Sequence, residues 1–192
     1  MRIVGGRFKG HSIAPPHGSA TRPTTDRVRE SVFNILAHGI DGLELEGARV
    51  LDLFAGTGAM GLQAISRGAR FCQFVEESAD AHGLVRRTAD ALAVIAQVKI
   101  WRRDATSLGP CAPQPGFDLV FADPPYGKGL GEKALKSLVA GAWLNRGAIV
   151  VLEESRKAEM PGIAGLALID TRAYGDTTIR FYRGDTGEDH EA

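Results

Sequence analysis

Short, nearly continuous apolar segments alternate with segments of helical periodicity from residue 48 onward. Apolar segments of this length, rich in Val, Leu and Phe, are typical of strands that are buried on both faces. The predicted strands cover residues 49–54, 70–76, 98–103, 117–122 and 148–153, and the predicted helices 59–67, 78–96 and 131–143. Strands that alternate with helices favour a parallel sheet covered on both faces, an α/β fold of the Rossmann-like type.

The two ends of the chain follow other patterns. Extended segments at 166–172 and 177–182, joined by Tyr174-Gly175-Asp176, predict an antiparallel C-terminal hairpin. Near the N-terminus, short β-compatible pieces at 2–4 and 11–14 predict a small hairpin or arm. A helix is predicted from Thr24-Thr25-Asp26, because a hydroxyl cap and an acid suit its first turn. Its apolar positions face the core, which leaves Arg27, Glu30 and Asn34 on the outer side.

Composition narrows the class of protein. With 192 residues, 44% hydrophobic and 24% charged, the chain can build one globular domain with a small appendage. It has no apolar segment near the roughly 20 residues of a membrane span and no signal peptide at its start, so a cytoplasmic protein is expected. Neither the two cysteines nor the five histidines have the spacing of metal ligands, so no metal is expected.

The formal net charge of zero hides an asymmetry between the two ends. Residues 1–40 hold six basic and two acidic side chains, a balance of +4, whereas residues 184–192 hold four acids and no base, a balance of −4. A basic N-terminal part is expected where a protein meets phosphate groups. The alternative is an ordinary solvated basic segment.

A glycine-rich loop follows the first strand of the predicted sheet. Gly56, Gly58 and Gly61 form a G-x-G-x-x-G pattern between a strand and a helix, and Glu76 follows about 20 residues later at the end of the next strand. Taken alone, this pattern would indicate a nicotinamide or flavin enzyme. Asp52 argues against that assignment, because a carboxylate at the strand end would repel a pyrophosphate and is costly to bury unpaired.

S-adenosylmethionine fits these residues better, because it carries a sulfonium and an ammonium group and no phosphate. Asp52 is predicted to lie near its methionine end and Glu76 at its ribose. Asp104, with the backbone of Ala105, could accept and donate hydrogen bonds at the adenine; the alternative for Asp104 is a cap of the following turn. The cofactor-binding set predicted from this pattern is Asp52, Phe54, Ala55, Gly56, Thr57, Gly58, Glu76, Asp104 and Ala105.

The turn Asp123-Pro124-Pro125-Tyr126 ends the fourth predicted strand. Consecutive prolines fix φ, remove two N–H donors and hold the preceding residues extended. The turn therefore presents a carboxylate, carbonyl oxygens and an aromatic ring in a stiff arrangement. Such a site suits a flat group that donates hydrogen bonds and stacks, such as a nucleobase with an exocyclic amine, and these residues are the predicted catalytic set.

Together these motifs resemble the ordered motifs of class I S-adenosylmethionine-dependent methyltransferases. The segment from Arg22 to Asn34, the start at Ile3-Val4-Gly5-Gly6-Arg7 and the end near Tyr174–Tyr182 closely resemble the RsmD family. This resemblance spans about residues 2–183. It implies transfer of a methyl group to N2 of a guanine in 16S ribosomal RNA, either as free RNA or in the assembled small subunit.

The resemblance also suggests where RNA would bind. Basic side chains near the N-terminus are predicted to hold its backbone: Arg7, Lys9, Arg22, Arg27 and Arg29. For Arg27 and Arg29, local ion pairs within the helix, or a role in shaping the cofactor pocket, are the alternatives. A monomer is expected.

The expected organisation is an RNA-contacting arm at 1–23, a methyltransferase domain at 24–183 and a disordered acidic tail at 184–192. Three other functions stay open at this point. A DNA adenine-N6 methyltransferase shares the Asp-Pro-Pro-Tyr turn, an RNA-binding module could hold the cofactor without using it, and a nicotinamide dehydrogenase shares the glycines.

Overall fold

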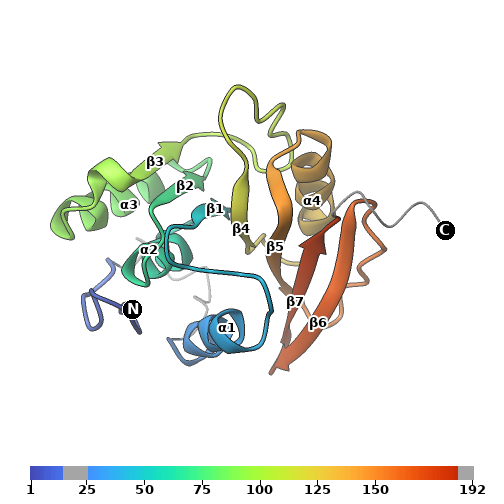
Figure 1. Ribbon diagram of the computed structural model, residues 1–192, viewed down its shortest axis with the longest axis horizontal. Coiled ribbons are helices and arrows are strands. Elements are labelled where there is room, and N and C mark those ends of the chain that lie inside the picture. Colours follow the sequence, from blue (N-terminus) through green and yellow to red (C-terminus); the bar gives the residue numbers. More distant parts are fainter. Residues whose placement is uncertain (15–25, 186–192) are drawn as a thin grey trace.

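The computed structural model describes residues 1–14 and 26–185. Its centre is a seven-stranded sheet with the order β3-β2-β1-β4-β5-β7-β6 (Figure 1). Strands β1 to β5 run parallel to one another, and β7 is antiparallel to its two neighbours, β5 and β6. This confirms the predicted mostly parallel sheet with an antiparallel C-terminal hairpin.

The strands follow the apolar segments of the sequence closely. Their bounds are β1 Arg49–Leu53, β2 Phe71–Val75, β3 Val98–Trp101, β4 Phe117–Ala122, β5 Leu144–Ser155, β6 Leu166–Tyr174 and β7 Thr177–Gly184. Strand β5 is longer than predicted at both ends, and its pairing with β4 shifts register between Phe117 and Leu119. Strand β6 is the outer edge, and most of its side chains are exposed.

Helix α1, Asp26–His38, precedes β1. Helices α2 Ala59–Ser66, α3 Ala79–Ala91 and α4 Leu130–Ala140 connect β1 to β2, β2 to β3 and β4 to β5. Ser78 caps α3, accepting a hydrogen bond from the Ala81 amide at 3.3 Å. Helix α3 ends earlier than predicted, because Ala93 adopts a positive φ of 55° and a short 3₁₀ turn, Ile95–Gln97, follows. Helix α4 likewise ends before Ala142, whose φ is 54°.

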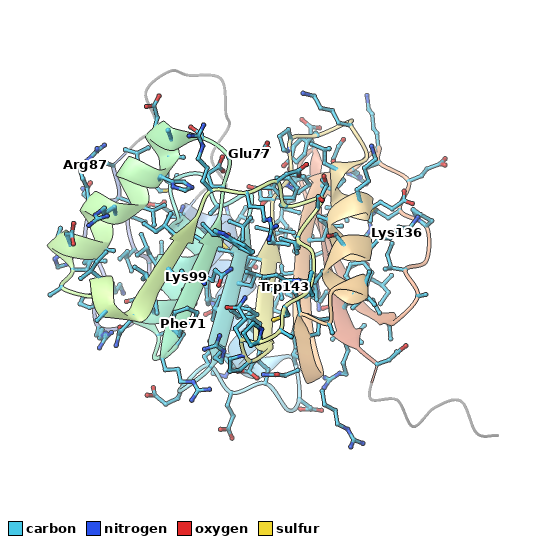
Figure 2. All side chains as sticks on the ribbon, turned by 90° about the horizontal axis from the view of Figure 1, so that it is seen from above. Phe71, Glu77, Arg87, Lys99, Lys136 and Trp143 are labelled. Carbon is cyan, nitrogen blue, oxygen red and sulfur yellow. The ribbon has the colours of Figure 1, made fainter. Side chains whose placement is uncertain are left out.

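The sheet has a core on each face. One face is covered by apolar side chains of α1, α2 and α3, and the other by α4 together with the connection between β3 and β4. Figure 1 shows α1 and α2 on one side of the sheet and α4 on the other. In Figure 2, Phe71 at the start of β2 and Glu77 just beyond its end mark opposite edges of the sheet. The edge near Glu77 is where the parallel strands end.

The N-terminal residues form a small hairpin that is part of the core. Arg2 and Ser12 pair in an antiparallel bridge, which confirms the predicted pairing of these two pieces. Ile3 and Ile13 are buried, with 1% and 0% exposure. The side chains of Gln63 and Ser66 on α2 both donate to the Gly5 carbonyl, at 3.0 and 2.7 Å. The hairpin is therefore fastened to the helix that follows the glycine loop.

Among the described residues no helix is long and apolar enough to cross a membrane. The predicted acidic tail, apart from Gly184 and Asp185, and most of the link between the hairpin and α1 lie outside the described residues. Gly184 itself ends β7.

Candidate active site

Strands β1 and β4 are neighbours in the middle of the sheet, and the strand order reverses between them. The chain builds outward from β1 through β2 to β3, and then from β4 through β5 in the opposite direction. Leu53 pairs with Ala122 at the ends of these strands, and the Asp123 amide donates to the Leu53 carbonyl at 3.5 Å. Open α/β sheets bind ligands outside the carboxyl ends of their strands at such a switch point. The glycine loop and the Asp-Pro-Pro-Tyr turn therefore lie side by side where a ligand is expected.

Phe54 turns the chain out of β1 into the glycine loop. Its φ of 57° lies in the left-handed region, which a bulky residue rarely adopts. A strained backbone of this kind is typical of functional sites. The Ala55 amide donates to the Val75 carbonyl at 3.2 Å, so the loop remains tied to the end of β2.

The second and third glycines allow the start of α2 to lie close to α3 and to β2. A Cβ atom on Gly58, whose φ is +75°, would lie 2.9 Å from Val85 Cγ2, and one on Gly61 would lie 2.4 Å from Phe74 Cε1. Neither position has room for a side chain. The pattern thus serves helix–strand packing here, which leaves the backbone around Gly56 and Thr57 at the edge of the site.

Asp52 is buried beneath this loop, with 4% exposure. Its Oδ2 accepts a hydrogen bond from the Gly61 amide, in the first turn of α2, at 2.9 Å. The pKa of Asp52 is raised from 3.8 to about 8, mainly by burial; the Gly61 hydrogen bond opposes this shift and the nearby Glu76 charge adds to it. A carboxyl group in this state would gain from an approaching cation.

Glu76 holds the glycine loop from the end of β2. Its Oε2 accepts from the Gly56 amide at 2.9 Å, and its Oε1 accepts from the Ser78 amide at 2.8 Å. The His82 ring nitrogen Nε2 lies 2.8 Å from the Glu76 carbonyl oxygen. These contacts fix the carboxylate, which remains half-buried at the edge of the site.

Asp104 follows β3, the strand next to β2 at the same edge of the sheet. Its Oδ1 accepts hydrogen bonds from the Thr106 amide and hydroxyl, both at 2.7 Å, so it caps the turn as the alternative interpretation states. The side chain is exposed and the neighbouring Ala105 is buried. A contact of Asp104 with an adenine stays a prediction.

The Asp-Pro-Pro-Tyr turn presents its groups at this edge. Pro124 is buried against Gly131 of α4, while Asp123 and Pro125 are exposed. The Tyr126 side chain is 43% exposed, and its hydroxyl donates to Glu153 Oε1 of β5 at 2.8 Å. The ring therefore lies open to solvent, with its hydroxyl held on the sheet.

The basic residues named from the sequence do not gather at one place. Arg29 is only 1% exposed and donates to the Arg2 carbonyl and to Asp26, so the prediction that it contacts RNA is wrong. Because its guanidinium joins the hairpin to α1, it cannot reach a phosphate. Arg27, two positions earlier, is exposed and lines an open groove along α1 with Glu30, Asn34 and His38.

Arg7 and Lys9 are exposed but lie away from the edge of the sheet that carries the Asp-Pro-Pro-Tyr turn. The Arg7 amide donates to the carbonyl of Ser66, the last residue of α2, and its guanidinium donates to Gln97 before β3. That end of α2 is about 12 Å from the glycine loop, at 1.5 Å per residue. Arg22 lies outside the described residues.

Sequence reasoning missed three exposed basic side chains beside the site. Lys128 follows the Asp-Pro-Pro-Tyr turn, and Arg156 and Lys157 follow the carboxyl end of β5. Their placement after strand ends could have identified them. It also missed Glu153 and Thr177, whose contact with Tyr126 depends on a pairing of strands far apart in the sequence.

Comparison with known proteins agrees with this geometry. The family model described as Conserved hypothetical protein 95 matches residues 1–183. The chain is 32% identical over 194 residues to ribosomal RNA small subunit methyltransferase D of Escherichia coli, covering all of this chain and 94% of that protein. It is 36% identical over 187 residues to YlbH, a candidate rRNA methyltransferase of Bacillus subtilis, covering 95% and 98% of the two chains.

Solved structures show the same likeness. A candidate methyltransferase of Escherichia coli, yhhF, superposes with a TM-score of 0.82 at 27% identity, covering 97% of this chain and 98% of that one. The likeness therefore extends over the sheet, its helices and the hairpins at both ends. The chain belongs to the family described as Conserved hypothetical protein 95, the RsmD family, and is a methyltransferase with the class I fold.

Proposed function

We propose that this protein transfers a methyl group from S-adenosylmethionine to the exocyclic N2 amine of a guanine in 16S ribosomal RNA. The observation that carries the proposal is the junction of β1 and β4, where the glycine loop over a buried carboxyl group adjoins the Asp-Pro-Pro-Tyr turn. The names of the Escherichia coli and Bacillus subtilis relatives support ribosomal RNA as the substrate.

The residues at the glycine loop fit S-adenosylmethionine. Asp52 is a buried acid whose pKa is raised to about 8, a state that a bound ammonium or sulfonium group would relieve. Glu76 lies at the end of the neighbouring strand, where ribose hydroxyls can donate to it. In this arrangement Phe54, Ala55, Gly56, Thr57 and Gly58 line the cofactor, and Asp104 and Ala105 meet its adenine. When bound, the cofactor supplies an electrophilic methyl group.

The catalytic turn prepares the guanine amine. The lone pair of the amine nitrogen is delocalised into the guanine ring. The site must therefore accept hydrogen bonds from the amine and favour a pyramidal nitrogen. Asp123 is the carboxylate acceptor and the Pro124 carbonyl a second acceptor, while Tyr126 stacks on the base. As the bond from N2 to the methyl carbon forms and the carbon–sulfur bond breaks, the amine loses one proton, which Asp123 or water accepts.

The rate gain comes mainly from alignment, because holding two reactants in line replaces a bimolecular encounter. The guanine must leave its stack to enter this site, which costs roughly a few kcal/mol. Stacking on an aromatic ring contributes about 1–3 kcal/mol per base and offsets much of that cost. The 43% exposure of Tyr126 supports this role.

The RNA backbone is held by basic side chains around the catalytic edge. Arg27 on α1 belongs to this set from the sequence, and Lys128, Arg156 and Lys157 join it because they are exposed beside the turn. Arg7 and Lys9 lie at the far end of α2 and would contact a more distant part of the RNA. Such binding weakens as salt rises, because each phosphate contact releases counterions.

The decisive assay incubates the protein with S-adenosylmethionine labelled in its methyl group and, separately, with naked 16S ribosomal RNA, assembled small subunits or duplex DNA. It then identifies the base that carries the label. Label in N2-methylguanine of the RNA substrates supports the proposal, and label in N6-methyladenine of DNA would replace it with the rival function. Absence of transfer with intact cofactor binding would favour a non-catalytic binding module.

The variant Asp123→Ala separates chemistry from cofactor binding. We expect methyl transfer to be lost, because the amine has lost its carboxylate acceptor, while affinity for S-adenosylmethionine in calorimetry stays within a few fold. Asp90→Ala, which removes an exposed acid from α3, is the control for loss of an acid. Equal loss of transfer and cofactor affinity in Asp123→Ala would show that Asp123 is structural.

A further inference from the structure

The hydroxyl of Tyr126 is held from two strands at once. Besides Glu153 Oε1 on β5, at 2.8 Å, it lies 3.1 Å from Thr177 Oγ1 at the start of β7. Since the phenol has one proton and gives it to the carboxylate, the Thr177 hydroxyl is the donor in the second contact. Both partners come from outside the catalytic turn, 27 and 51 residues away in sequence.

The chemistry of the phenol agrees with this arrangement. Burial, together with the nearby Glu153 charge, holds the pKa of Tyr126 above its ordinary value of 10, although the Thr177 hydrogen bond opposes the shift. The phenol therefore keeps its proton as a donor at neutral pH. A tyrosine side chain has two rotatable bonds. Fixing the position of the hydroxyl oxygen sets the first bond. The phenol O–H and its lone pairs prefer the plane of the ring, so two fixed partners on that oxygen also favour one setting of the second bond, and with it one ring plane.

The strands that carry these partners are themselves held in place. Ser155 of β5 pairs with Thr177 of β7, and Thr177 pairs with Tyr174 across the hairpin. The Tyr174 hydroxyl lies 2.6 Å from Ser31 Oγ on α1. A continuous set of contacts thus runs from α1 through the tip of the hairpin to the catalytic turn.

From this geometry we propose that Glu153 and Thr177 are positioning residues, which set the plane of the Tyr126 ring against which the target guanine stacks. The inference rests on the proposed function, because it assumes that the base enters beside Tyr126. The C-terminal hairpin then contributes to the reaction as well as forming one edge of the sheet. Neither residue contacts the reacting atoms.

The experiment compares steady-state kinetics on the RNA substrate that the wild-type protein methylates. We expect Thr177→Val to lower kcat about five- to tenfold, the range for one lost hydrogen bond that aligns a reactant. The KM for RNA, the affinity for S-adenosylmethionine and the melting temperature should stay close to wild type. Thr171→Val, an exposed threonine on β6, is the matched control and should keep the wild-type kcat.

A double-mutant cycle identifies the route of the effect. In a Tyr126→Phe background, which lacks the hydroxyl, Thr177→Val and Glu153→Gln should cause no further loss of kcat. Glu153→Gln alone should lose less than Glu153→Ala, because the amide oxygen still accepts a hydrogen bond.

Three results would overturn the positioning role: wild-type kcat in Thr177→Val, an equal loss in both backgrounds, or a kcat loss matched by a lower melting temperature. These outcomes differ from failure of the proposed function itself. In that case the wild-type protein would place no methyl group on guanine, and the cycle would have no activity to compare.

Discussion

Replacing Asp52 with asparagine should change how the stability of the protein depends on pH. Asp52 is 4% exposed and accepts one backbone hydrogen bond, from Gly61. Asparagine has nearly the same shape and keeps an oxygen acceptor for that amide, but it cannot ionise. The variant therefore removes the ionisable group and little else.

The sign and size of this pH dependence follow from the pKa of Asp52, which rises from 3.8 to about 8 on folding, mainly through burial. Between these two values the unfolded protein has released this proton and the folded protein still binds it. The free energy of unfolding therefore falls as pH rises, by about 1.4 kcal/mol per pH unit. From pH 5 to pH 7 this amounts to roughly 3 kcal/mol, a contribution that Asp52→Asn lacks.

Urea unfolding at pH 5, 6 and 7 without cofactor measures the effect. Other ionisable groups are common to both proteins, so the difference in unfolding free energy between variant and wild type isolates residue 52. That difference should grow in favour of Asp52→Asn as pH rises, whereas it should stay nearly constant for Asp90→Asn, an exposed control. A pH-independent difference for Asp52→Asn would refute the reasoning, because it would mean that Asp52 is ionised throughout.

Two further predictions concern packing. Gly61→Ala should lower the free energy of unfolding by about 1–3 kcal/mol, because the new Cβ would lie 2.4 Å from Phe74 Cε1. Thermal melts measure this effect, and Gly83→Ala in α3 is the control, which should be neutral or stabilising. A stable Gly61→Ala protein would show that α2 can move away from β2. Gln73→Met should raise the free energy of unfolding by about 1 kcal/mol or more, because the fully buried amide has no hydrogen-bond partner among the described residues. Destabilisation in urea would instead reveal a partner for that amide.

The parts of the fold that local pattern determines could be predicted from the sequence. The apolar segment 117–122 coincides with β4, because a strand buried on both faces needs little beyond continuous hydrophobicity. The placement of Gly56 and Asp123 at the same edge of the sheet follows from the rule that parallel strands end at one edge. Tertiary contact was required only to show which strands are neighbours.

Other features depend on contacts distant in sequence. Arg29 was assigned to RNA as one of the basic side chains near the N-terminus, but its guanidinium donates to the Arg2 carbonyl, 27 residues away, and to Asp26. Helix α3 ends near Ala93 in the left-handed region, without the glycine that normally indicates such an end. The hydroxyl contacts of Tyr126 required the register between β5 and β7, which no local pattern contains.

The central pairing of Leu53 with Ala122 also has a consequence for handling the protein. The loop after β1 and the turn after β4 come from separate halves of the chain and meet only when the sheet is complete. A small molecule that touches both will favour the fully folded state by mass action, raising the melting temperature of the whole domain with its concentration. A thermal-shift screen of nucleoside analogues can therefore rank ligands before any RNA substrate is prepared.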